Sequence, residues 1–313
     1  MKAAQSKNKK PKAKYRVRNW SQYNEALVKR GSLTFWLDEA AIRSWHSTQP
    51  NGKRGRDLHY SDQAITTALM IQAVFGLSLR ATEGFINSLF ELMGLELSSP
   101  DYSSISKRAK TVTVDIRRPK GPVAHLVFDA TGLKVYGEGE WKVRKHGKEK
   151  RRSWRKLHLG VDGQGHWLIC AELSLDNVAD GQVLAPMLRP LRRQIGSVYA
   201  DGAYDSRQCY EEIAHKSARP LIPPRSNAGY WQAGHPRNEA VAALKAGELA
   251  EWKVASGYHR RSIGETAMWR FKQLTGNRLR LRDYNGQVGE AMARVAVLNK
   301  MTALGMPVSD MVR

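Results

Sequence analysis

Four polar side chains recur at intervals that place them on one side of a single helix: Tyr258, Arg261, Glu265 and Lys272. Because each residue of an α-helix turns by about 100°, these side chains fall within an arc of roughly 60°. A carboxylate flanked by two cations and a phenol suits metal-assisted phosphoryl transfer on a polyanion, since the acid binds a divalent cation and the bases bind phosphates.

The opposite side of the same segment is apolar. It carries Ile263, Ala267, Phe271 and Leu274 at helical spacing. Such a stripe is typical of a helix that packs on a hydrophobic core. The segment therefore predicts a helix that buries one face and presents the four polar side chains on the other.

Two aspartates upstream each follow a short apolar run. Asp129 follows Leu-Val-Phe and precedes small residues, and Asp201 follows residues 196–200 and precedes a glycine. We expect both at the ends of strands. Taken singly, an aspartate in this position is more often a turn former or a helix cap. Asp205 lies close by, but Asp201 is the better candidate because it follows the apolar run directly.

Together these residues resemble the signature of DDE transposases encoded by bacterial insertion sequences. The tyrosine-arginine-glutamate-lysine spacing matches, and the acids are separated by 72 residues (129 to 201) and 64 residues (201 to 265). Segments 153–162 and 100–106 are similar to the insertion-sequence family-five group. The resemblance extends over about residues 60–313.

The resemblance implies a catalytic and metal-binding set of three acids: Asp129, Asp201 and Glu265. Two Mg²⁺ ions, with Mn²⁺ as a substitute, would share Asp129, with Asp201 completing one site and Glu265 the other. Carboxylate-only ligation suits such hard cations. The expected activity is hydrolysis of a DNA strand at the terminus of the element, followed by joining of that 3′ end to target DNA.

The resemblance also implies DNA contacts and an assembly. Arg261 and Lys272 would bind phosphates near the cut, and Tyr258 would pack against or hydrogen-bond to the terminal nucleotide. The partners would be the terminal inverted repeats of the element and target DNA. A homodimer would hold two ends together before cutting.

The overall charge favours a polyanionic partner. Fifty-one Lys and Arg against 29 Asp and Glu give a formal charge of +22, and nucleic acid is the expected partner rather than an anionic membrane. No apolar run approaches the ~20 residues of a membrane span. Cys170 and Cys209 form no disulfide framework or metal-ligand spacing, which favours the cytoplasm, in association with the nucleoid. No nucleotide-binding glycine motif is present, so no nucleotide cofactor is expected.

Periodicity divides the chain into three parts. Residues 1–18 contain eight Lys or Arg and no acid, which predicts a disordered basic arm. Residues 19–120 have helical periodicity and are predicted to form an all-α DNA-binding domain. Within them, the polar-basic segment 101–110 follows a turn and is consistent with a helix-turn-helix reader, with Lys107 and Arg108 as DNA contacts. An ordinary surface helix is an equally good interpretation.

Residues 121–313 are predicted to form the catalytic domain. Strands are expected at 123–135, 155–161, 166–174, 196–200 and 219–222, with helices at 180–194, where prolines should break the helix, and at 206–217. This pattern alone predicts an α/β fold. The resemblance makes it a ribonuclease-H-like mixed sheet flanked by helices.

Two segments are additional to a minimal fold of that type. Segment 142–156 carries nine Lys or Arg and one Glu, so Arg151 and Arg152 are predicted to contact the DNA backbone. Residues 226–256 form an insertion that contains Trp231 and Trp252. These tryptophans are expected to pack within the fold rather than to hold a flipped base.

Three other functions remain compatible with a basic chain. A nuclease or junction resolvase of the same fold would cut DNA without joining it, and a non-catalytic derivative would only bind DNA. The three intact acids and the four-residue signature disfavour both. An RNA-binding protein is disfavoured because no aromatic-rich RNA-reading motif is present.

Overall fold

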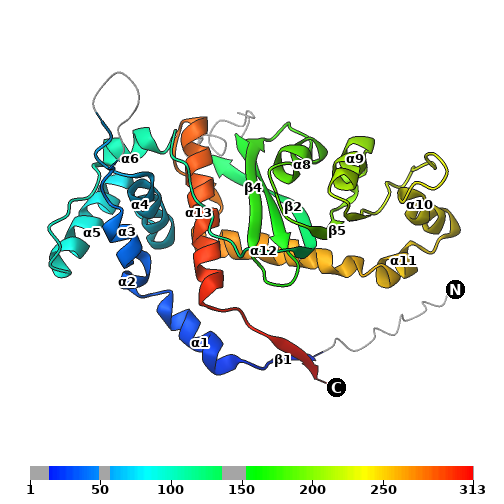
Figure 1. Ribbon diagram of the computed structural model, residues 1–313, viewed down its shortest axis with the longest axis horizontal. Helices are drawn as coiled ribbons and strands as arrows, with labels where there is room; N and C mark the ends of the chain where they lie inside the picture. Colours follow the sequence, from blue (N-terminus) through cyan, green and yellow to red (C-terminus); the bar gives the residue numbers. More distant parts are fainter. Residues whose placement is uncertain (1–13, 49–56, 136–152, 313) are drawn as a thin grey trace, which may run out of the picture.

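The computed structural model describes residues 14–48, 57–135 and 153–312. A mixed sheet of six strands forms its centre (Figure 1). The strands are β2 (Val123–Val135), β3 (Trp154–Asp162), β4 (Leu168–Leu175), β5 (Ile195–Tyr199), β6 (Arg219–Leu221) and β7 (Arg278–Leu279).

The order of the strands is β4-β3-β2-β5-β6, with β7 added to β2. β2, β3 and β4 form an antiparallel meander, whereas β5 and β6 run parallel to β2. In chain order the five main strands are arranged 3-2-1-4-5 with only the second reversed. This is the ribonuclease-H-like arrangement, and the predicted α/β fold is confirmed.

Helices cover both faces of the sheet. On one face, Leu126 and Phe128 of β2 pack against α8 (Asp180–Leu188) and α9 (Arg207–His215). On the other, Val127 faces α12 (Ser262–Thr275) and α13 (Tyr284–Leu304). Alternation along a strand directs successive side chains to opposite faces, which explains this division. The helix predicted at 180–194 contains Pro186 and ends at Leu188, two residues before Pro190.

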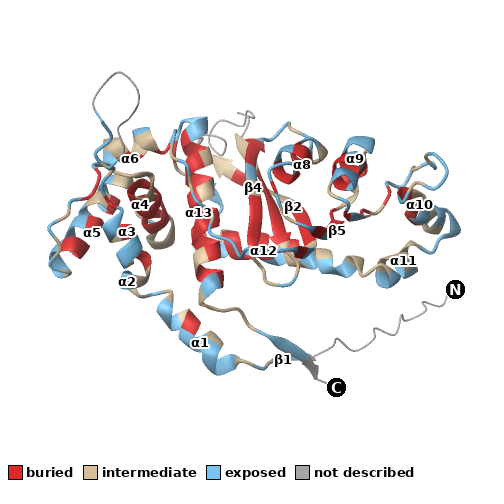
Figure 2. Cartoon of the chain, viewed as in Figure 1, coloured by how far each residue is buried: buried red, intermediate tan, exposed pale blue. Residues whose placement is uncertain are grey.

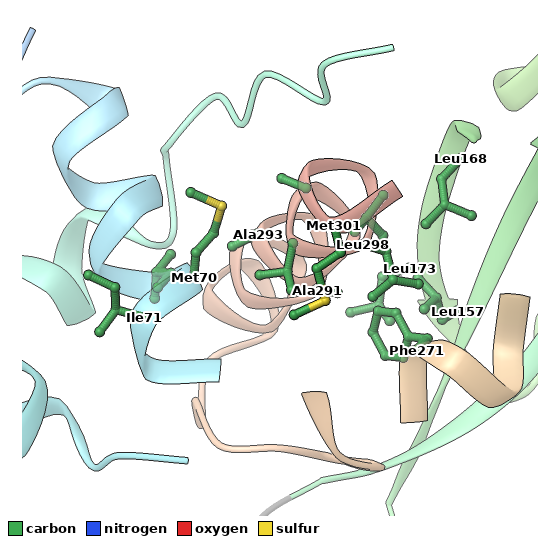
Figure 3. Packing of buried hydrophobic residues seen from close by; sticks show 14 of the residues in the cluster. Met70, Ile71, Leu157, Leu168, Leu173, Phe271, Ala291, Ala293, Leu298 and Met301 are labelled. Atoms are coloured by element: carbon green, nitrogen blue, oxygen red, sulfur yellow. The ribbon is translucent and has the colours of Figure 1, made fainter. Parts of the chain in front are cut away.

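α13 is the central helix of the molecule. It stands between the sheet and α4 (Asp62–Phe75), and it is buried along most of its length (Figures 1 and 2). Figure 3 shows Met70 and Ile71 of α4 on one side of this helix, and Phe271, Leu157 and Leu173 on the other. The buried polar side chains of α13 are paired inside the protein, as the ion pair between Glu290 and Arg294 illustrates.

The amino-terminal region is helical, as predicted. Its predicted caps are present: Ser61 accepts the backbone N–H of Ala64 at the start of α4, and Ser78 accepts that of Ala81 at the start of α5. The helices are α1 (Trp20–Lys29), α2 (Leu33–Trp36), α3 (Glu39–Arg43), α4, α5 (Leu79–Leu92) and α6 (Tyr102–Arg108).

The helical region and the sheet region share one core, which extends from Trp36 to Met301. The two regions pack closely at Gly289 of α13, because a Cβ there would overlap the carbonyl oxygen of Ala109 at the end of α6. The boundary predicted at residue 120 is therefore not a break in the packing. The helical region and the sheet region each have an apolar face, and α13 packs against both, so the two regions form one unit.

The prediction of a disordered arm over 1–18 is wrong for its last part. Lys14–Val17 form β1, which pairs antiparallel with β8 (Ser309–Val312) at the other end of the chain. Residues 1–13 lie outside the described part. The pairing partner is almost 300 residues away, so no local pattern indicated it.

The predicted insertion contains α10 (Arg237–Ala246) and α11 (Leu249–Ala255). Both tryptophans pack within the fold as expected: Trp231 lies 5.3 Å from Tyr210 between ring centroids, and Trp252 lies 6.2 Å from Tyr258. In the described ranges, no single helix is long and apolar enough to span a membrane, and only α4 and α5 taken together, bent by 106°, meet those criteria.

Candidate active site

The two aspartates lie level with one another on adjacent parallel strands. Val127 of β2 is paired with Tyr199, the last residue of β5, and each aspartate is two residues further along the chain. Asp201 follows the end of β5, as predicted. Asp129 does not end its strand, because β2 continues in pairing with β3 as far as Lys134. Asp129 is thus held within the strand by its pairing with Leu159 of β3, just beyond the last residue of β2 that pairs with β5.

Asp129 points toward α12. Alternation along β2 gives it the same face as Val127, and both lie against Gly264 of α12. A Cβ on Gly264 would lie 3.0 Å from the Asp129 Cβ and 3.1 Å from the Val127 Cγ1. The absence of a side chain at this position lets the helix that carries Glu265 contact the strand that carries Asp129. Gly264 was not among the residues predicted from the sequence, although its place directly before Glu265 was a signal.

The polar signature begins one turn before α12. Tyr258–Arg261 form a short 3₁₀ helix, η2, rather than the first turn of the predicted α-helix. The Tyr258 hydroxyl donates to the Ala200 carbonyl oxygen at 3.2 Å, next to Asp201, and burial raises the pKa of this phenol to about 12. Tyr258 therefore holds η2 against the end of β5, and its contact with a terminal nucleotide stays a prediction.

Arg261 brings the three acids together. Its Nη2 lies 3.4 Å from the Asp129 Oδ1 and 3.6 Å from the Asp201 Oδ2, and its Nη1 lies 2.5 Å from the Glu265 Oε1. Carboxylates from β2, the end of β5 and α12 thus meet around one guanidinium. Local sequence could not predict this role for Arg261, because two of the three contacts join residues far apart in the chain.

Exposure rises across the three acids. The side chain of Asp129 is 12% exposed, that of Asp201 40% and that of Glu265 62%, so the site opens to solvent on the Glu265 side. Burial raises the pKa of Asp129, while Arg261 counteracts this shift and the charges of Asp201 and Glu265 add to it. A second cation would relieve this repulsion.

The donor set fits a hard divalent cation. All three converging groups are carboxylates, which Mg²⁺ and Mn²⁺ prefer, and they already surround one positive charge. In the described part of the chain, no three His, Cys, Asp or Glu side chains are close enough to form a ready-made metal site. A divalent cation bound by these carboxylates would therefore compete with the Arg261 guanidinium.

The solvent side of α12 carries two further residues. Lys272 is partly exposed two turns after Glu265, as predicted. Trp269 lies one turn after Glu265 and is 63% exposed, which is unusual for so large an apolar side chain. Trp269 was not among the residues predicted from the sequence, although its spacing of four residues from Glu265 places both on one side of the helix.

Asp205 is excluded as a ligand. Both of its carboxylate oxygens accept hydrogen bonds from Arg237 of the insertion, at 2.5 and 2.8 Å, and the pair is buried. The preference for Asp201 is consistent with this arrangement. The ion pair also anchors the insertion beside the active site.

The two DNA contacts predicted in the helical region, Lys107 and Arg108, differ in their surroundings. Lys107 is exposed on α6. Arg108 instead donates to the Asp62 Oδ1 at 2.5 Å and to the Tyr60 carbonyl oxygen at 2.8 Å, so its guanidinium stabilises the fold and we withdraw it as a DNA contact. The sequence pattern could not show the partner, which lies 46 residues away. Arg151 and Arg152 lie outside the described residues.

Similarity to known proteins agrees with this geometry. Two family models described as "Transposase DDE domain" match the chain, one over residues 28–138 and the other over residues 121–300. The second alone covers more than half of the chain and includes all three acids.

Solved structures show more distant likeness. The piggyBac transposase in a synaptic complex with hairpin DNA is similar over 88% of this chain and 73% of that chain, with 12% identity and a TM-score of 0.40. A simian T-cell lymphotropic virus intasome, in complex with a PP2A regulatory subunit, is similar over 66% of this chain and 67% of that chain, with 13% identity and a TM-score of 0.25. At these TM-scores the assignment rests on the family models, and by them this chain belongs to the DDE transposases.

Proposed function

We propose that this protein binds the terminal inverted repeats of an insertion sequence, cleaves the ends of the element and joins the 3′ ends to target DNA. The observation that supports this most is the convergence of Asp129, Asp201 and Glu265 from three separate elements on a single cationic centre. A surface that only bound DNA would have no use for three clustered carboxylates beneath it.

The three acids would hold divalent cations, Mg²⁺ with Mn²⁺ as a substitute and two ions in the full site. Bound there, the metal would activate the attacking oxygen and stabilise the leaving oxygen of a phosphate. Asp129 is the most buried and is fixed within β2 by its pairing with β3, which suits a ligand shared by both ions. Glu265 is the most exposed and would meet the DNA first.

The chain itself would bind and orient the DNA around these acids. Lys272 and the displaced guanidinium of Arg261 would bind phosphates beside the scissile bond. Trp269 offers an exposed aromatic face between Glu265 and Lys272, on which an unpaired base near the cut could stack. A homodimer would hold two ends together.

A strand-transfer assay tests the proposed activity. Full-length protein is incubated with duplexes that carry the element's own ends, a supercoiled target plasmid and Mg²⁺. We expect cleaved ends and joined products, and neither when EDTA replaces the metal. Cleavage without joining would instead indicate a nuclease of the same fold. Binding without cleavage would indicate a non-catalytic DNA-binding protein.

Arg261→Ala tests the competition at the centre of the site. Because Arg261 and the metal share the same carboxylates, the variant should gain a larger Mg²⁺-dependent rise in Tm than the wild type. Cleavage should still fall, by roughly ten- to a hundredfold, because a phosphate contact is lost. Thermal denaturation at increasing Mg²⁺ and the cleavage rate measure the two effects.

Arg260→Ala is the matched control. Arg260 is the adjacent arginine, is exposed, and has none of the Arg261 contacts with the three acids. The Arg260→Ala variant should show the same Mg²⁺-dependent rise in Tm as the wild type. An equal Mg²⁺ response in all three proteins would show that Arg261 does not compete with the metal. Lys272→Arg should have a mild effect, since a positive charge near the phosphate is kept.

A further inference from the structure

A groove rich in arginine lies at the junction between the helical region and the sheet region, away from the three acids. It has a volume of about 740 Å³ and is formed by the turn between α4 and α5, the start of α6 and the segment that joins α12 to α13. No acidic residue is among the described residues that line it. Its charged side chains are Arg80, Arg278, Arg280 and Arg282.

A buried ion pair holds one wall of this groove in place. Glu290 of α13 accepts the backbone N–H groups of Arg280 and Leu281, at 2.9 to 3.0 Å. Arg294 donates to Glu290 at 2.5 Å and to the carbonyl oxygen of Arg278 at 2.7 Å. Both charged side chains are almost completely buried, so the backbone that carries three of the four arginines is fixed before any ligand arrives.

The four arginines divide into structural and outward-facing groups. The Arg280 guanidinium donates to the Leu77 carbonyl oxygen at 2.5 Å and joins the two walls of the groove. Arg80 lies over the ring of Tyr102, with its guanidinium carbon 4.2 Å from the ring centroid. Arg80, Arg278 and Arg282 are exposed. The groove thus presents exposed cations on a prearranged frame.

Two paths through the fold give the distance from the groove to the active site. Along β2, Asp129 is five residues from Lys134, which pairs with Arg278, and this corresponds to about 17 Å. Along α12, Gly264 beside Asp129 is 11 residues from Thr275 in the groove wall, which again corresponds to about 17 Å. At 3.4 Å per base pair, this distance is about five base pairs.

We propose that the arginine groove binds the phosphate backbone of the element's end about five base pairs from the scissile phosphate. Guanidinium groups bind phosphates in a two-pronged geometry, and an acid-free groove between the helical region and the sheet region places both regions on the same duplex. This inference rests on the proposed function, since it takes the cut phosphate at Asp129 as its reference point.

The test compares an Arg80→Ala, Arg282→Ala double variant with Arg192→Ala in the full-length protein. Arg192 is exposed and precedes β5, at the opposite end of that strand from Asp201. With labelled end duplex, the double variant should bind at least about tenfold more weakly, and the slope of log Kd against log salt should fall by about 1.8, or 0.9 for each lost phosphate contact. Arg192→Ala should match the wild type.

Cross-linking then tests the position. The two native cysteines are buried, so an Arg282→Cys variant carries a single accessible thiol. With duplexes that bear a thiol-tethered phosphate at successive positions, disulfide formation should be greatest about five base pairs from the cleavage site. A cross-linking maximum at another position would contradict the proposed binding of DNA in the groove. So would an unchanged salt slope in the double variant. If the protein still cuts and joins, either result leaves the proposed function intact. A wild-type protein that neither binds nor cuts the ends would overturn both.

Discussion

Asp129→Asn, Asp201→Asn and Glu265→Gln should each lower the rate of end cleavage on the order of 10³-fold or more, because residues of one catalytic unit are individually indispensable. Each amide keeps the shape of the side chain but removes a charge that binds the metal. Cleavage and joining should be lost together, since both reactions use the same site. Single-turnover cleavage of a labelled end duplex measures the loss.

The folded state and DNA binding should change little in these variants. Each substitution removes one negative charge from a repelling group, and Arg261 keeps two of its three partners. Affinity for DNA comes from the large excess of basic side chains elsewhere. Glu211→Gln, an exposed acid on α9, is the control and should retain full activity. Near-normal cleavage by Glu265→Gln would show that another carboxylate completes the site.

Features encoded by local periodicity could be predicted from the sequence. The apolar face of α12, with Ala267 and Phe271, follows from helical spacing, and the extent of β2 follows from its apolar run. The three acids were identifiable because their spacing matched a family signature. The proximity of the two aspartates also followed, since β2 and β5 are parallel neighbours, although Asp129 lies within β2 rather than at its end.

Features that depend on contacts between distant segments could not be predicted. The pairing of β1 with β8 joins opposite ends of the chain, and the internal ion pair of Arg108 depends on Asp62. The packing of α13 on both the sheet and α4 merges two predicted domains into one core. Each case depends on a partner that lies tens or hundreds of residues away, which composition and spacing do not encode.

Gly264→Val should nearly abolish cleavage by moving α12 away from β2. A Cβ at this position lies within 3.1 Å of both Asp129 and Val127, so a branched side chain has no space unless the helix shifts. Glu265 is the next residue and would move with it. Because a displacement of about 1 Å can cost a hundredfold in rate, we expect a loss of about that size for Val and about tenfold for Ala.

Gly84→Ala provides the matched control for stability. Gly84 lies in the exposed interior of α5, where a new Cβ meets nothing within 4 Å. Alanine there should raise the free energy of unfolding by about 0.5–1 kcal/mol, as expected for glycine in a helix. Gly264→Ala should fail to show this gain, because steric conflict with Asp129 offsets it. Denaturant unfolding measures the stability of both variants, and the cleavage rate measures their activity. If Gly264→Ala is as stabilised as Gly84→Ala and cuts at the normal rate, then close packing of α12 on β2 does not set the position of Glu265.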